Sequence, residues 1–219
     1  MFNCLPTSVF NLARCRYNLR TFAVKTALLL LACVPILANS NVIAQEPKAL
    51  KAQPSKEVGK EVDKDGWKPL LEEKELEGWT ITDFYGHGEV KREGEILILE
   101  PGKPLTGITS KKKDFPTSNF EIEFEARRTK GNDFLCGLTF PVGKGFASFI
   151  GGGWGGGLVG LSSVDGADAS ENSTSSHVDF KNDQWYKFRI LVDDDFVRGF
   201  VDKKEVFAQG RRSRVQYEN

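Results

Sequence analysis

The strongest constraint on the fold of this chain is a strict alternation of apolar and charged side chains. In residues 119–128, Phe120, Ile122 and Phe124 alternate with three glutamates. A period of two residues places every second side chain on one face of a β-strand, so this segment is expected to be a strand with one buried face. The same alternation runs through residues 134–140 and 186–192, and further strands are expected at 146–150, 158–161 and 196–201.

Turn residues and short strands together indicate an all-β fold. Residues 90–92 and 95–99 flank Glu93-Gly94, which is typical of a β-hairpin. No segment shows a sustained helical period, and only residues 70–76 are compatible with a helical turn or two. Short strands joined by Gly- and Asp-rich turns predict an antiparallel sandwich or jelly roll.

The first 44 residues have the layout of a secretory signal peptide. Arg14, Arg16, Arg20 and Lys25 form a basic region without any acid, and an apolar run of 11 residues, Ala27–Leu37, follows. Small residues then predict cleavage after Ala44 and Sec-type export to the periplasm or the extracellular space. The run is shorter than the ~20 residues of a membrane span, so no stable span is expected after cleavage. An uncleaved anchor and a lipoprotein signal ending at Cys33 are the alternatives.

The remaining chain divides into a linker and one domain. Residues 45–66 mix Lys, Glu, Asp and Pro without an aromatic residue, which is typical of a flexible tether. Residues 67–219 are then the folded domain. Of the four cysteines only Cys136 lies in this domain, and its place in an apolar strand favours a buried thiol over a catalytic one.

The charge of the chain argues against nucleic acid as a partner. Lys and Arg number 30, as do Asp and Glu. The basic excess of residues 1–44 leaves the rest of the chain mildly acidic, which gives no general attraction to phosphates.

Several motifs in the second half of the chain and just before it form a recognisable set: Leu76–Trp79, Asp133–Val142, Gly152–Gly156, Gly160–Ser163, Asp165–Asn172 and Gln184–Tyr186. Together they resemble one family of secreted bacterial proteins, the 3-keto-disaccharide hydrolase domain, formerly a domain of unknown function. The resemblance covers about residues 67–210 and implies the concanavalin A-like lectin/glucanase sandwich.

The chain departs from the family pattern in two places. Many members carry an Asn-Ser-Gly turn followed by a strand with an acid that faces the cleft, whereas here the turn at 131–134 reads Gly-Asn-Asp-Phe and the strand at 146–150 has no acid. The family also ends with a further strand beside the first one, whereas residues 211–219 contain no apolar strand. We therefore expect a sandwich that lacks its last strand.

The resemblance implies a hydrolase of 3-keto-glycosides that acts by elimination and hydration. Such a site needs a base, a donor or a cation at the ketone oxygen, and a platform for the sugar ring. The candidate bases are Asp133, Glu171, His87 and Glu89. Each of them is also compatible with an ordinary solvated turn.

Two further motifs are candidates for ligand binding. Asp165, Asp168 and Glu171 concentrate oxygen donors that suit Ca²⁺ or another divalent cation, and Asp165 and Asn172 are candidates for substrate binding. A solvated acidic turn is the alternative. Trp154, surrounded by glycines, is either a platform that stacks on a sugar or a core residue that needs small neighbours.

Three functions remain open from the sequence. The first is an enzyme that cleaves 3-keto-glycosides, and the second is a non-catalytic glycan-binding module. The third is an inactive fragment that lacks the final strand. In the first two cases the partner is a carbohydrate.

Overall fold

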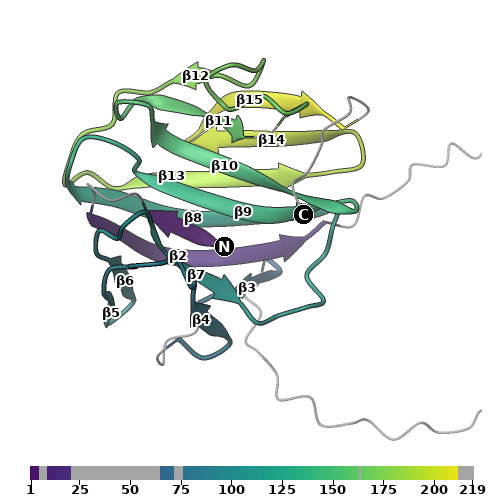
Figure 1. Cartoon of the computed structure of the whole chain (residues 1–219). Helices are drawn as coiled ribbons and strands as arrows, with labels where there is room; N and C mark the ends of the chain where they lie inside the picture. The colour runs from purple at the N-terminus through teal and green to yellow at the C-terminus, as the bar shows by residue number, and fades with distance from the viewer. Residues whose placement is uncertain (5–8, 21–64, 72–75, 163, 212–219) are drawn as a thin grey trace, which may run out of the picture. The chain divides into compact units, whose positions relative to one another are not determined.

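The alternation in residues 119–128 becomes an eleven-residue strand, β8 (Phe120–Lys130), in the computed structural model (Figure 1). The model describes residues 1–4, 9–20, 65–71, 76–162 and 164–211. Phe120, Ile122 and Phe124 of β8 are buried in the core. The described residues contain strands and no helix, so none of them forms a helix able to cross a membrane.

Strand β8 lies near the middle of an eight-stranded antiparallel sheet. The strands in spatial order are β15 (Lys204–Gly210), β14 (Phe196–Val201), β13 (Tyr186–Val192), β8, β2 (Val9–Leu19), β6 (Ile96–Leu99) and β5 (Val90–Glu93), and β3 (Trp67–Pro69) also pairs with β2.

A seven-stranded antiparallel sheet contributes the other apolar face of the core. Its strands in spatial order are β12 (Ser176–His177), β11 (Leu158–Ser162), β10 (Gly145–Gly153), β9 (Cys136–Val142), β1 (Phe2–Cys4), β7 (Thr106–Ser110) and β4 (Trp79–Ile81).

Aromatic side chains join the two sheets. Phe124 of β8 stacks on Phe188 of β13, with ring centres 5.2 Å apart. Phe149 of β10 lies 5.6 Å from Phe188, and Phe2 of β1 meets Phe124 edge-on at 5.3 Å. Because Phe2 and Phe149 belong to one sheet and Phe124 and Phe188 to the other, these contacts form the centre of a β-sandwich.

The N-terminal residues have a role that the sequence analysis did not foresee. β1 lies between β9 and β7, and β2 lies between β8 and β6. Figure 1 shows β2 running beside β8 over most of its length. Phe10 and Leu12 of β2 have no exposed surface. Residues 1–4 and 9–20 are therefore part of the sandwich in this structure.

Paired charges fix the register of β2 against β8. The three arginines assigned to a signal peptide each contact a carboxylate of β8, and β13 supplies further cations to two of these carboxylates. The pairs are Arg14–Glu125 at 3.2 Å, Arg16–Glu123 at 2.7 Å, Arg20–Glu121 at 2.6 Å, Lys187–Glu123 at 2.8 Å and Arg189–Glu121 at 3.6 Å.

The all-β sandwich and the strands expected from alternation are confirmed, including the hairpin of β5 and β6. Cys136 is buried, as predicted. Four other predictions concern residues outside the described ranges in whole or in part: the apolar run Ala27–Leu37, cleavage after Ala44, the linker at 45–66 and the helical turn at 70–76. The last residues, 212–219, also lie outside them.

Candidate functional site

A glycine-rich turn carries an exposed tryptophan between β10 and β11. We call residues 153–157 the tryptophan turn. The indole of Trp154 is 45% exposed, and its backbone φ of 46° is in the left-handed region. A Cβ on Gly156 would come 2.2 Å from the carbonyl oxygen of Asn132. Only glycine permits this approach, so the turn packs directly on the loop after β8.

Asp133 fastens these two segments to each other. Its Oδ1 atom accepts hydrogen bonds from the backbone N–H of Phe134 at 2.9 Å and of Gly155 at 3.1 Å. The Phe134 ring lies 5.7 Å from that of Trp154. Asp133, a predicted catalytic base, therefore holds the aromatic pair in place, and its Oδ1 is committed to the backbone.

A buried arginine links a third segment to the same group. The Arg128 guanidinium donates from Nε to Asn182 Oδ1 at 2.6 Å, from Nη1 to the Asp133 carbonyl at 3.4 Å and from Nη2 to the Phe180 carbonyl at 3.3 Å. Burial lowers the pKa of Arg128, against the opposing effect of nearby Asp133. Its hydrogen bonds connect the loop after β8 with the segment between β12 and β13.

His177 lies against the tryptophan turn, which the sequence analysis did not predict. It pairs with Leu158 in the β11–β12 ladder, and a Cβ on Gly157 would come 2.1 Å from its Cε1. The exposed imidazole makes no hydrogen bond or ion pair with any described residue, and the same is true of the indole N–H of Trp154. The turn therefore presents an aromatic face, a free donor and a free imidazole.

Asn172, predicted to bind substrate, organises its own loop instead. Its Nδ2 donates to the carbonyls of Leu161, Ala167 and Asp168 at 2.7, 3.1 and 2.8 Å. Its Oδ1 accepts from the N–H and hydroxyl of Thr174. Both polar atoms of the amide are thus occupied within residues 161–174.

The acidic residues of this loop do not form a cluster. Asp165, Asp168 and Glu171 are all exposed. Within the ranges that the structure describes, no group of three or more His, Cys, Asp and Glu side chains could hold a metal ion. The geometry therefore gives the predicted cation site no support.

The remaining predicted bases lie on another loop, between β4 and β5. His87 is exposed, and its Nδ1 lies 2.9 Å from the Gly88 carbonyl. Glu89 is also exposed and forms an ion pair with Lys91 at 2.9 Å. Of the sequence-predicted site residues, the structure joins Asp133 to the turn of Trp154 and Asn172 to the backbone carbonyl of Asp168.

The described strands form an antiparallel β-sandwich, and an exposed aromatic turn joins β10 to β11. A scan against family models matches residues 66–216 to the 3-keto-alpha-glucoside-1,2-lyase-like domain. The match covers more than half of the chain, so the protein belongs to this family and to the carbohydrate-active class that the family suggests. Searches of curated proteins and of solved structures returned no significant match.

Proposed function

We propose that the tryptophan turn and His177 form a carbohydrate site at which 3-keto-glycosides are cleaved. The observation that carries the proposal is the exposed Trp154 indole, held by Asp133 beside an imidazole without a partner. Aromatic rings stack on the apolar faces of sugars, and a rigid ring loses little conformational freedom on binding. The family match at residues 66–216 supplies the class of substrate.

The reaction is an elimination followed by hydration. A ketone at carbon 3 acidifies the hydrogen on carbon 2, and a base removes that proton. The electron pair forms the carbon 1–carbon 2 double bond, the bond from carbon 1 to the leaving oxygen breaks, and that oxygen takes up a proton. Water then adds across the double bond, so the net change is hydrolysis.

Two side chains of the site suit this chemistry. The exposed His177 imidazole can accept the carbon 2 proton on a ring nitrogen, which is the role that a histidine base commonly has in proton transfer. The Trp154 N–H has no acceptor in the described structure and is available to a ligand oxygen. Asp133 acts as a positioning residue, since its Oδ1 holds the backbone of the turn.

A specific observation favours a second function, the binding of glycans without catalysis. The other predicted bases, Glu171, His87 and Glu89, lie on exposed loops that are separate in the chain from the tryptophan turn. A site with an aromatic platform and a single imidazole binds sugar rings even if it does not cleave them.

The decisive experiment compares 3-keto-glucosides with their parent glucosides, using the full chain. Cleavage is followed by product release and binding by calorimetry. We expect Trp154→Ala to abolish binding, and His177→Gln to abolish cleavage while binding persists. Phe196→Ala removes another exposed aromatic, which is 37% exposed, and should change neither. Binding without cleavage in the wild type establishes the second function, and binding unaffected by Trp154→Ala refutes the site.

We further propose Sec-type export to the periplasm or beyond in a bacterium, from the basic and apolar pattern of residues 14–37. The arginines of that pattern pair with β8 in this structure, so cleavage after Ala44 would remove β1 and β2 from the sandwich. Mass spectrometry of the mature protein tests export. A membrane-retained chain that still contains Arg20 refutes it.

A further inference from the structure

An open cavity of about 610 Å³ lies beside the segment that leads into β8. Its lining shares no residue with the tryptophan turn and includes neither Asp133 nor His177. The cavity is therefore distinct from the tryptophan turn. Its volume falls in the range of ~300–1,000 Å³ that is typical of small-molecule sites.

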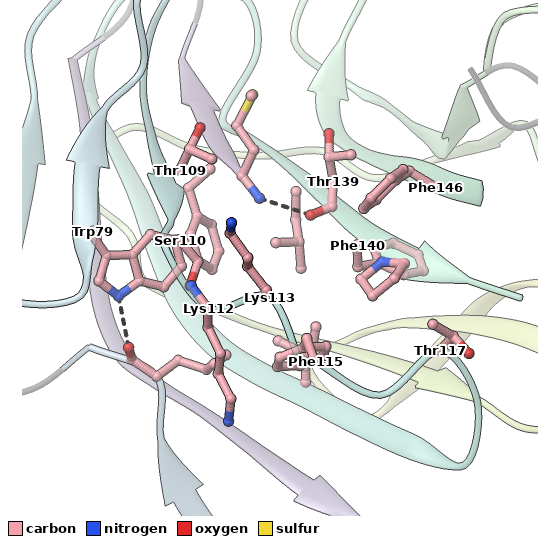
Figure 2. Close-up of a pocket in the computed structure, with 16 residues that line it drawn as sticks. Trp79, Thr109, Ser110, Lys112, Lys113, Phe115, Thr117, Thr139, Phe140 and Phe146 are labelled. Carbon is pink, nitrogen blue, oxygen red and sulfur yellow. Dashed lines mark hydrogen bonds between the residues drawn. The ribbon is translucent and has the colours of Figure 1, made fainter. Parts of the chain in front are cut away.

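Apolar side chains, several of them aromatic, form most of the cavity wall. Figure 2 shows Trp79 on one side and Phe140 and Phe146 on the other, with Phe115 between them. Phe146 is half-exposed at 50%, which is unusual for a large apolar side chain. Hydroxyl groups are interspersed with the rings, from Thr109, Ser110 and Thr117. The wall therefore suits an apolar body with a few polar contacts.

The charges on the cavity wall are all of one sign. Among the described residues that line it are Lys112 and Lys113 and no Asp or Glu. The Lys112 ammonium donates to the Tyr17 hydroxyl at 3.0 Å and lies 5.0 Å from the centre of that ring. Lys113 has no hydrogen bond or ion pair with any described residue. In Figure 2 the two lysine side chains point in opposite directions, and that of Lys113 extends toward the middle of the cavity.

The cavity wall also carries the α-amino group of Met1, but Lys113 is its principal free cation. The α-amino group of Met1 donates to the Thr139 carbonyl at 2.8 Å. Burial lowers the pKa of this group to about 6, so it is mostly uncharged at neutral pH. An ammonium without a partner in an aromatic cavity favours a ligand that carries a negative charge.

We propose that this cavity binds a small organic anion with an aromatic or alkyl body, whose acidic group is held by Lys113. The apolar body lies among Phe115, Phe140 and Phe146. This site is independent of the proposed sugar site, because it uses other residues at another part of the sandwich. A neutral sugar suits it less well, since no carboxylate or amide side chain lines it.

The test uses a matched pair of fluorescent probes on the full chain. Anilinonaphthalene sulfonate has an aromatic body and a negative charge, and phenylnaphthylamine is a neutral relative. We expect the anionic probe to bind one site with unchanged near-ultraviolet circular dichroism. Lys113→Gln should weaken the anionic probe about tenfold and leave the neutral probe unaffected, because it removes one charge-assisted contact. Phe146→Ser should weaken both.

Two control variants separate this site from general surface binding. Lys111→Gln removes a neighbouring exposed lysine outside the lining, and Phe196→Ser removes an exposed aromatic outside it. Neither should alter probe binding. Absence of binding, equal effects of Lys111→Gln and Lys113→Gln, or binding only with loss of native dichroism would overturn the proposal. Dimerisation that Phe146→Ser abolishes would assign the surface to a second copy and overturn it as well.

Discussion

The position of β2 in the sandwich predicts that residues 9–20 determine the stability of the whole domain. Phe10→Ala is the sharpest perturbation, because the Phe10 side chain has no exposed surface and its strand pairs with β6 on one side and with β8 on the other. Truncation of a fully buried phenylalanine costs about 3–5 kcal/mol. A domain of this size has a total stability of only ~5–15 kcal/mol, so the loss is a large part of the whole.

The measurement is thermal and urea unfolding of the full chain, followed by circular dichroism and tryptophan fluorescence. At ~2–4 °C per kcal/mol, Phe10→Ala should lower the Tm by about 6–20 °C. Leu12→Ala, also fully buried, should cost about 2–5 kcal/mol. Arg14→Gln is the matched control in the same strand, because the Arg14 side chain is 71% exposed and its ion pair is worth ~0.2–1 kcal/mol.

The reasoning fails if Phe10→Ala unfolds within about 1 °C of the wild type. In that case β2 contributes nothing to the core, and its residues are free for another use such as a targeting signal. A stable, cooperatively folded chain from residue 65 onward with an unchanged Tm would lead to the same conclusion.

Three other results are expected. Burial acts to raise the pKa of Glu123, but hydrogen bonds from Lys187 and Arg16 outweigh it and hold the pKa below its ordinary 4.5. The stabilisation that ionised Glu123 gives to the fold is thus complete above pH 4.5 and is lost as the pH falls through the lower pKa of the folded state. Glu123→Gln should therefore reduce the dependence of stability on pH in acid. Asn172→Ala should lower the free energy of unfolding by about 1–3 kcal/mol and make residues 164–175 more susceptible to proteolysis. Equal protection of this loop in the variant and in the wild type would contradict the structural role of Asn172. Cys15, whose pKa burial raises, should react with a thiol reagent only on unfolding in a chain whose other three cysteines are serine; immediate labelling of the native chain would contradict its burial.

Several strands within residues 90–201 could be predicted because apolar and polar residues alternate there in the sequence with a period of two. Glu121, Glu123 and Glu125 mark the outer face of β8, and the intervening residues are buried. In β2 the same rule fails. A register shift between Ala13 and Arg16 moves the buried positions from Phe10 and Leu12 to Cys15 and Tyr17. A bulge of this kind reverses parity, so a search for simple alternation misses the strand.

The basic residues near the N-terminus are compatible with two interpretations for a related reason. Arginines before an apolar run are typical of a signal peptide. The same arginines are typical of a strand that lies beside a row of glutamates, but those glutamates are more than a hundred residues away in the chain. Only the folded sheet brings the two rows together.

The candidate site was predictable in part. The glycines around Trp154 left open whether its indole is exposed or in the core, and the position of the turn depends on the contact between Gly156 and Asn132. The position of His177 beside the tryptophan turn depends on the pairing of β11 with β12, which no local sequence pattern predicts. Asn172 was selected as a ligand residue, whereas its two polar atoms are consumed by the backbone and by Thr174.

The charge pairs between β2 and β8 can form only some time after the ribosome has made β2. They join residues that are 101, 107 and 111 positions apart. At ~5–20 residues per second, the ribosome makes Glu121–Glu125 roughly 5–20 s after it makes β2. During this interval the N-terminal arginines and the apolar run behind them have no partner strand and are accessible to any targeting factor. Once β8 emerges, the same arginines pair with its glutamates, which ends that interval of exposure.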